Sequence, residues 1–153
     1  MAIALNPALA PIPAQAQQTA APAPAPTAQT TKPAVKATPQ LRMELNSLKT
    51  VGQNCRVGFV IRNDMGAPIS HLMFELVLFD RRERIIQLLV IDAGRLPRAK
   101  TRVRQFDLRG LPCDDIGRAL LNDITKCGKP PLNALKCLDA TAVSSRTGVP
   151  FEL

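Results

Sequence analysis

From Leu41 onward, apolar and polar residues alternate with the two-residue period of β-strands. In residues 55–62, Val57, Phe59 and Ile61 share one face, whereas the other face carries two arginines, a glycine and a valine. This pattern is typical of a strand that buries one face. The same reasoning predicts further strands at residues 69–79, 85–91 and 101–108.

The stretch 69–79 differs from the other predicted strands because it is apolar on both faces. Leu72, Phe74, Leu76 and Leu78 fall on one face, and Met73, Val77 and Phe79 on the other. A strand with two apolar faces is expected in the centre of a sheet. Turn-forming residues at 63–66 precede this stretch, and polar residues at 80–83 follow it. Strands at this spacing, joined by short turns, predict an antiparallel β-sandwich.

Two interpretations remain open for residues 115–126. Ile116, Leu120 and Ile124 fit a strand face, but together with Ala119 they also fit one face of a helix. We favour a strand, because the sandwich needs a partner for the central stretch 69–79. The last stretch, 138–153, is also compatible with β-structure and is expected to lie at a sheet edge.

The first forty residues have a different composition, with thirteen Ala, eight Pro and no acidic residue. Residues 1–19 resemble part of an export signal, since an apolar run ends in Ala14-Gln15-Ala16, although the basic start of such a signal is missing. Residues 20–40 are predicted to form a disordered Ala/Pro linker, because they cannot bury enough apolar surface to offset the entropy of ordering. A plain disordered tail on a cytosolic protein is the alternative.

Size and composition limit the remaining 113 or so residues, 41–153, to one domain. The chain has five Phe and no Trp or Tyr, so its core must be aliphatic. It lacks the aromatic platforms on which proteins stack unpaired bases, and nucleic acid is therefore not an expected partner. No apolar run is long enough to predict a transmembrane span.

The order of these strands resembles that of immunoglobulin-like or fibronectin-type sandwich modules in bacterial exported envelope proteins. The resemblance rests on Cys55-Arg56-Val57-Gly58-Phe59-Val60-Ile61-Arg62-Asn63 and on Phe74-Glu75-Leu76-Val77-Leu78-Phe79-Asp80. In such modules an Asn ends one strand and an Asp ends the next. The resemblance implies an all-β immunoglobulin-like fold and a periplasmic or secreted location, with no catalytic residues to transfer.

The four cysteines, Cys55, Cys113, Cys127 and Cys137, lack the close pairwise spacing of a zinc site, and the chain has one histidine, His71. Disulfides are the better interpretation. If the strands follow the immunoglobulin-like order, those containing Val57 and Leu120 run in the same direction in facing sheets. That order implies a Cys55–Cys113 bridge and a Cys127–Cys137 bridge.

Positive charge is the main functional hint, since the net charge is +8. Five cations without an intervening acidic residue occur in one ten-residue stretch: Arg95, Arg98, Lys100, Arg102 and Arg104. A second group contains Arg81, Arg82 and Arg84. An anionic surface or envelope protein is the expected partner, and a solvated face without a partner is the alternative. The even-numbered cations from 98 to 104 are predicted to form an exposed row on a strand.

No motif for a nucleophile, a phosphate-binding loop or a metal-dependent hydrolase occurs in the chain. The adjacent Asp114 and Asp115 would point apart on a strand and are not expected to act as a catalytic pair. We therefore predict a module without enzymatic activity, cofactor or metal, which acts in binding or assembly at the cell envelope. The alternative is a small periplasmic enzyme whose site carries no recognisable motif.

Overall fold

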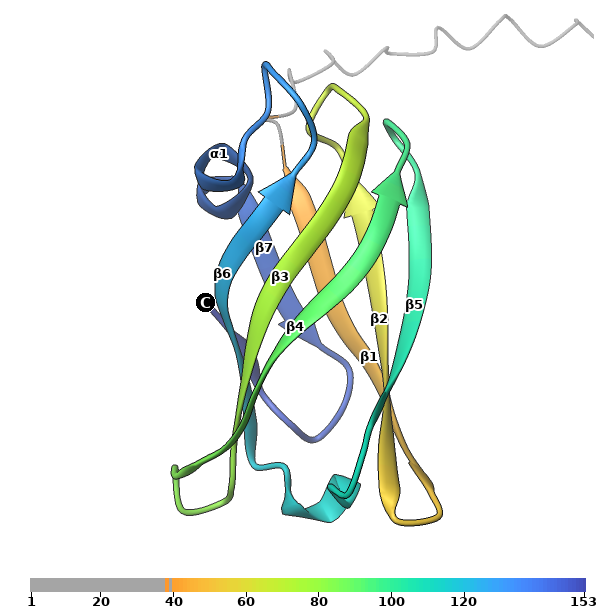
Figure 1. Ribbon diagram of the computed structural model, residues 1–153, viewed down its shortest axis with the longest axis vertical. Helices are drawn as coiled ribbons and strands as arrows, with labels where there is room; N and C mark the ends of the chain where they lie inside the picture. The colour runs from red at the N-terminus through yellow and green to blue at the C-terminus, as the bar shows by residue number, and fades with distance from the viewer. Residues whose placement is uncertain (1–37, 39) are drawn as a thin grey trace, which may run out of the picture. The chain divides into compact units, whose positions relative to one another are not determined.

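The computed structural model describes residue 38 and residues 40–153, and these residues form two four-stranded sheets packed face to face (Figure 1). The strand order in the first sheet is β5-β2-β1-β7, and in the second it is β4-β3-β6-β8. The first sheet contains β1 (Leu41–Val51), β2 (Asn54–Asn63), β5 (Thr101–Leu108) and β7 (Thr141–Ser145). The second contains β3 (Ile69–Phe79), β4 (Ile85–Leu96), β6 (Arg118–Cys127) and β8 (Phe151–Glu152). The described part of the chain is therefore an all-β sandwich.

The predicted alternation in β2 is confirmed. Val57, Phe59 and Ile61 are buried between the sheets, and the ring of Phe59 meets those of Phe74 and Phe151 edge-on. Edge-to-face contacts of this kind add to the stabilisation that comes from burial of apolar area. Leucine, isoleucine and methionine fill most of the remaining core.

The central position of β3 is also confirmed, because it pairs with β4 on one side and with β6 on the other. Residues 118–127 form a strand, which settles the choice between strand and helix, and β6 is the partner that β3 requires. Only the short 3-10 helix η1 (Cys113–Asp115) precedes it. The expected edge position of the C-terminal stretch is confirmed by β8, which pairs with β6 at the edge of the second sheet.

Two features differ from the expected antiparallel sandwich. β7 pairs with β1 in parallel, and β8 pairs with β6 in parallel. A six-residue helix, α1 (Ala134–Asp139), lies between β6 and β7, and the side chain of Asn133 caps it by accepting a hydrogen bond from Lys136 N. β6 ends at the same end of the sandwich at which β1 begins, and the helix lies there, so β7 can start beside the first residue of β1 and run parallel to it.

Cys55 is bonded to Cys113, and Cys127 is bonded to Cys137. These are the pairs that the immunoglobulin-like order implied. The first bridge ties the start of β2 to η1, and the second ties the end of β6 to α1. Disulfides persist in oxidising compartments, so the two bridges indicate a location outside the reducing cytosol.

The predicted export-signal remnant, residues 1–19, lies outside the described residues, as does the predicted linker, residues 20–40, apart from Thr38 and Gln40. Gln40 leads directly into the sheet, because its backbone exchanges hydrogen bonds with Asp64. Within the described part of the chain, no helix has the length and apolarity to cross a membrane.

Candidate binding surface

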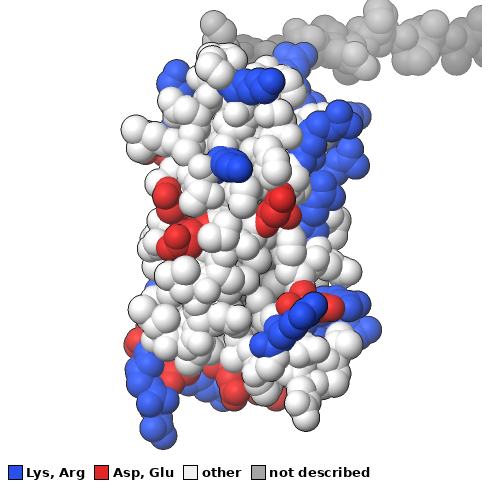
Figure 2. Space-filling model, viewed as in Figure 1, with Lys and Arg blue, Asp and Glu red and all other residues white. Residues whose placement is uncertain are grey.

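The five predicted cations lie together where β4 ends, turns and continues as β5. We call this surface the basic corner: Arg95, Arg98, Lys100, Arg102 and Arg104. Basic side chains gather along the side of the molecule that β4 and β5 form (Figure 2). The corner joins the two sheets, because β4 is an edge strand of one sheet and β5 of the other.

A buried asparagine holds the turn of the basic corner. The side chain of Asn63 is fully buried, and its amide nitrogen lies 3.0 Å from both Ala67 O and Leu96 O. Its main chain contributes as well, since Asn63 N donates to Lys100 O and Asn63 O accepts from Ala99 N. One residue thus anchors both sides of the turn.

Ala99 has a φ of 56°, in the left-handed region that residues with a Cβ adopt rarely. The hydrogen bond from Lys100 N to Pro97 O closes a four-residue turn in which Ala99 occupies the third position. A positive φ at that position is typical of a type II turn, and it leaves the Arg98 and Lys100 side chains exposed.

The predicted exposed row of even-numbered cations from 98 to 104 on one strand is wrong in two respects: Arg98 and Lys100 lie in the turn before β5, and Arg104 is not fully exposed. Phe106 and Leu108 turn toward the core, so the other even-numbered residues of β5 lie on the same face of the sheet. Arg104 is half-buried, and its Nε donates to Ala93 O at 2.6 Å. Arg104 therefore joins β5 to β4 across the open side of the sandwich, whereas Arg102 stays exposed.

Within residues 40–153, no cation of the basic corner forms a salt bridge. Several carboxylates elsewhere in the sandwich pair with other bases. Asp64, for example, meets both Arg42 and Arg62, at 3.1 and 2.8 Å. The corner therefore has an excess of positive charge at its surface.

Two further arginines, Arg42 and Arg62, lie beside the basic corner, although they are far from it in the sequence. Both line a shallow hollow of about 360 Å³, together with Asp64, Arg98 and Thr38. The pairing of β2 with β5 would have indicated Arg62, because this residue lies directly opposite Thr101 at the start of β5. The hollow is thus lined by three arginines and one carboxylate, and it extends the positive surface from the corner onto β2 and β1 of the first sheet.

The second basic group of the sequence lies at the other end of β4, in the β3–β4 turn (residues 80–84). Here Asp80 accepts hydrogen bonds from the backbone nitrogens of Arg82 and Arg84, and its Oδ2 meets the Arg84 guanidinium at 2.6 Å. The hydrogen bond from the backbone N–H of Arg84 contributes most to lowering the pKa of Asp80. The Arg84 guanidinium lowers this pKa further, whereas desolvation of the carboxylate opposes both effects.

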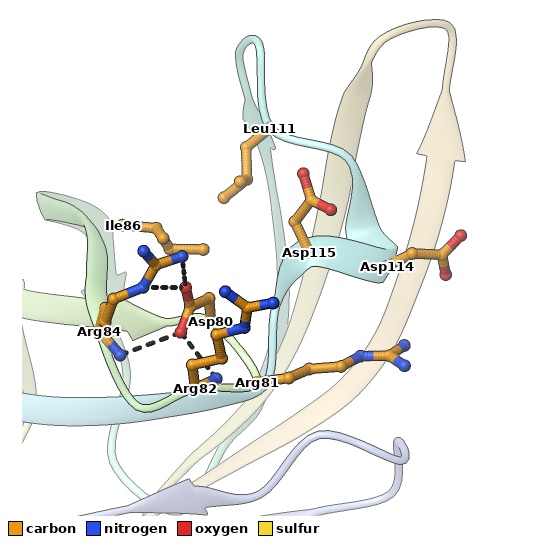
Figure 3. Close-up of a pocket in the computed structure, with 8 residues that line it drawn as sticks. All are labelled: Asp80, Arg81, Arg82, Arg84, Ile86, Leu111, Asp114 and Asp115. Carbon is orange, nitrogen blue, oxygen red and sulfur yellow. Dashed lines mark hydrogen bonds and ion pairs between the residues drawn. The ribbon is translucent and has the colours of Figure 1, made fainter.

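A cavity of about 390 Å³ lies beside this turn, and Figure 3 shows its lining residues. Arg81 and Arg82 share it with Asp114 and Asp115, which come from η1, so charges of both signs meet there. Arg81 and Arg82 form no salt bridge within residues 40–153, but the two carboxylates beside them lower the net charge of the cavity. This end of β4 is therefore less suited to an anionic partner than the basic corner.

The one histidine of the chain pairs with a carboxylate. His71 Nε2 lies 2.9 Å from Asp92 Oδ1 on the exposed face of the second sheet. The same carboxylate accepts from Gly94 N, and this bond, followed by the contact with His71, lowers the pKa of Asp92. Among the residues that the structure describes, no group of three or more potential ligands could hold a metal ion.

The fold is similar to that of IrmA from Escherichia coli. The two structures superpose with a TM-score of 0.57 at 9% sequence identity, over 69% of this chain and 92% of the IrmA chain. At this identity the likeness concerns the fold alone. No protein-family model and no curated protein matches the chain.

Proposed function

We propose that this protein is an exported, non-enzymatic immunoglobulin-like module that binds an anionic partner at the cell envelope through its basic corner. The observation that carries the proposal is the absence of any carboxylate partner for the five corner cations within residues 40–153. Unneutralised cations attract an anionic surface over about 8–10 Å at physiological salt.

The scaffold supports the proposal because the corner is held in a fixed shape. Asn63 anchors its turn from the core, and Arg104 ties β5 to β4. Cations on such a turn keep their positions when a partner approaches, so little ordering entropy is lost on binding. The two disulfides and the two-sheet architecture support an exported, immunoglobulin-like module.

Binding to lipid vesicles tests the proposal. The full disulfide-bonded chain should bind vesicles of phosphatidylglycerol more tightly than vesicles of phosphatidylcholine, and added salt should weaken the binding. The double variant Arg98→Gln/Arg102→Gln removes two exposed charges without touching Arg104. It should lower the affinity for the anionic vesicles about thirtyfold, which corresponds to about 1 kcal/mol for each of the two charges at a membrane surface.

The matched control is Arg81→Gln/Arg82→Gln, which removes the same charge from the β3–β4 turn. Its affinity should stay within about twofold of the unmodified protein, because carboxylates already offset those arginines. Equal losses in the two double variants would show that net charge alone drives binding. Absence of binding in the unmodified protein at low salt would contradict an anionic membrane surface as the partner.

A further inference from the structure

Strand β4 exposes apolar side chains at the edge of the second sheet. Residues 85–91 contain no charged residue, and Ile85, Leu88 and Val90 are 65%, 58% and 51% exposed. An edge strand leaves a row of backbone N–H and C=O groups without partners in its own sheet. Natural proteins usually protect such edges with charges, prolines or bulges, and this stretch has no charge and no proline.

The apolar surface of β4 adjoins apolar residues on the outer face of the sheet. Leu88 lies opposite Val77 on β3, and Val77 lies opposite Leu120 on β6. In Figure 2 an uncharged area lies over the lower middle of this face, and acidic side chains lie above it. Val77 is itself buried, and Glu75 on β3 lies opposite Val90, so the exposed apolar residues are confined to β4 and its immediate surroundings. The solvated face of an antiparallel sheet is normally polar, so this row of apolar residues, the apolar strip, marks a surface for association.

The two halves of the β4 edge differ in protection. Near its end, Arg104 donates to Ala93 O at 2.6 Å and lies 3.5 Å from Arg95 O, so a side chain occupies the edge there. The pairing with β3 is irregular in both halves, around Ala93 and between Gln87 and Ile85, as expected for bulges, so the side chain of Arg104 is what distinguishes the two halves. Along residues 85–91, no side chain of the described part of the chain hydrogen-bonds to the backbone. The open edge and the apolar strip therefore coincide.

A second copy of the same chain fits this edge. When two β4 strands pair antiparallel about a two-fold axis at Leu88, the uncharged stretch 85–91 meets itself. The same register sets Arg84 opposite Asp92 of the second copy. Both side chains are exposed, and Arg84 Nη1 and Asp92 Oδ2 form no hydrogen bond or salt bridge within residues 40–153. Charge complementarity at both ends of the paired strands thus favours self-association over an extended peptide of either charge.

We propose that two copies of this protein pair β4 against β4, antiparallel about Leu88, and join their second sheets into one continuous sheet. The pairing satisfies the free backbone groups of both edges and sets Leu88 opposite Leu88, and Val90 opposite Ile86, of the other copy. It leaves the basic corner free, because the pairing ends before the part of the edge that Arg104 occupies.

Sedimentation velocity of the full disulfide-bonded chain tests this pairing. The unmodified protein should form a dimer as its concentration rises to about 0.2 mM, because a short edge interface of this kind binds in the micromolar range. Leu88→Lys places two lysines at the two-fold axis and should weaken dimerisation at least about tenfold. Leu88 is exposed, so the variant should fold, and circular dichroism and the Tm check that it does.

Val103→Lys is the matched control. Val103 is 61% exposed and also lies on an edge strand, β5, but of the other sheet. This variant should dimerise like the unmodified protein. A protein that stays monomeric over the whole concentration range would overturn the proposal, as would equal effects of the two lysine substitutions.

A charge exchange tests the register. Arg84→Glu and Asp92→Arg should each weaken dimerisation, because each sets like charges opposite one another. The double variant Arg84→Glu/Asp92→Arg should restore it at least in part, since the opposite charges again face one another across the two-fold axis. Failure of the double variant to recover, with Leu88→Lys still disruptive, would overturn the register centred on Leu88.

Discussion

The two ends of β4 carry similar numbers of arginines in the sequence but differ in what surrounds them. At the β3–β4 turn, Asp80 pairs with Arg84, while Asp114 and Asp115 share a cavity with Arg81 and Arg82. At the basic corner, a neutral residue, Asn63, holds the turn, and none of the five cations meets a carboxylate within residues 40–153. A count of charges along a chain thus says little about which charges remain available to a partner.

Removal of the Asn63 amide should cause the largest loss of stability. The substitution Asn63→Ala leaves the carbonyls of Ala67 and Leu96 without their donor in a buried position. We expect the free energy of unfolding to fall by about 3 kcal/mol, measured by urea denaturation of the oxidised protein. A loss below about 1 kcal/mol would show that the corner does not depend on this anchor.

Arg104 and Arg102 lie on the same strand, but only Arg104 is expected to contribute to the stability of the fold. Arg104→Met keeps much of the apolar stem but removes the bond to Ala93 O, and should cost about 2 kcal/mol. Arg102→Met, two residues away, should change the free energy of unfolding by about 0.5 kcal/mol or less. Urea denaturation of both variants checks the difference, and equal effects would contradict the role assigned to Arg104.

The turn of the basic corner and the β3–β4 turn each contain one residue other than glycine at positive φ. These residues are Ala99, at 56°, and Glu83, at 60°. Ala99→Gly relieves this conformation and should stabilise the protein by about 0.5 kcal/mol, because the relief is partly offset by the greater freedom of glycine in the unfolded chain. Glu83→Gly should bring no gain, since it also removes the carboxylate that pairs with Arg118 at 2.8 Å. Thermal unfolding of the two variants would detect the difference as a higher Tm for Ala99→Gly alone.

The anchors of the two turns should differ in their response to acid, and this is the smallest effect we expect. The pKa of Asp80 is lowered in the folded protein from its ordinary value of 3.8, so its ionised form favours folding at pH values above 3.8. That contribution is lost as the pH falls through the lowered pKa. The stability difference between the unmodified protein and Asp80→Asn should therefore shrink between pH 7 and pH 3.

Asn63 does not titrate, so the difference between the unmodified protein and Asn63→Ala should stay constant over the same range of pH. Urea denaturation at pH 7, 5 and 3 compares the two variants directly. If both differences shrank in parallel, the acid response would belong to the protein as a whole rather than to the carboxylate of the β3–β4 turn.

The sequence was most informative where alternation was unbroken, as in β2 and β3, because burial of one face fixes the inward residues. It was less informative about β5, where Val103 is exposed and Phe106 points inward. The even positions of Phe106 and Leu108 already placed Arg104 on the inward face, so this signal was present in the sequence. The hydrogen bond from Arg104 to Ala93 O was not predictable, because that contact depends on how closely the two sheets approach.

The parallel strands and the short helix could not be predicted from local pattern. β7 has five residues, and its parallel partner β1 lies far away in the sequence. The cap of α1 at Asn133 is a recognisable helix signal, but a six-residue helix is too short for apolar periodicity to reveal. The basic corner was predicted as a set of residues, whereas its neutral anchor and its extension through Arg42 and Arg62 required the fold.

The two disulfides join the first cysteine of the chain to the second and the third to the fourth. Of the three ways to pair four cysteines, this is the one in which neither bridge encloses or crosses the other along the chain. A chain that emerges from a translocation channel with its N-terminus first exposes its thiols in the same order. An oxidase that joins each newly exposed thiol to the preceding free one would therefore produce the native bonds directly, and maturation would not require a thiol isomerase.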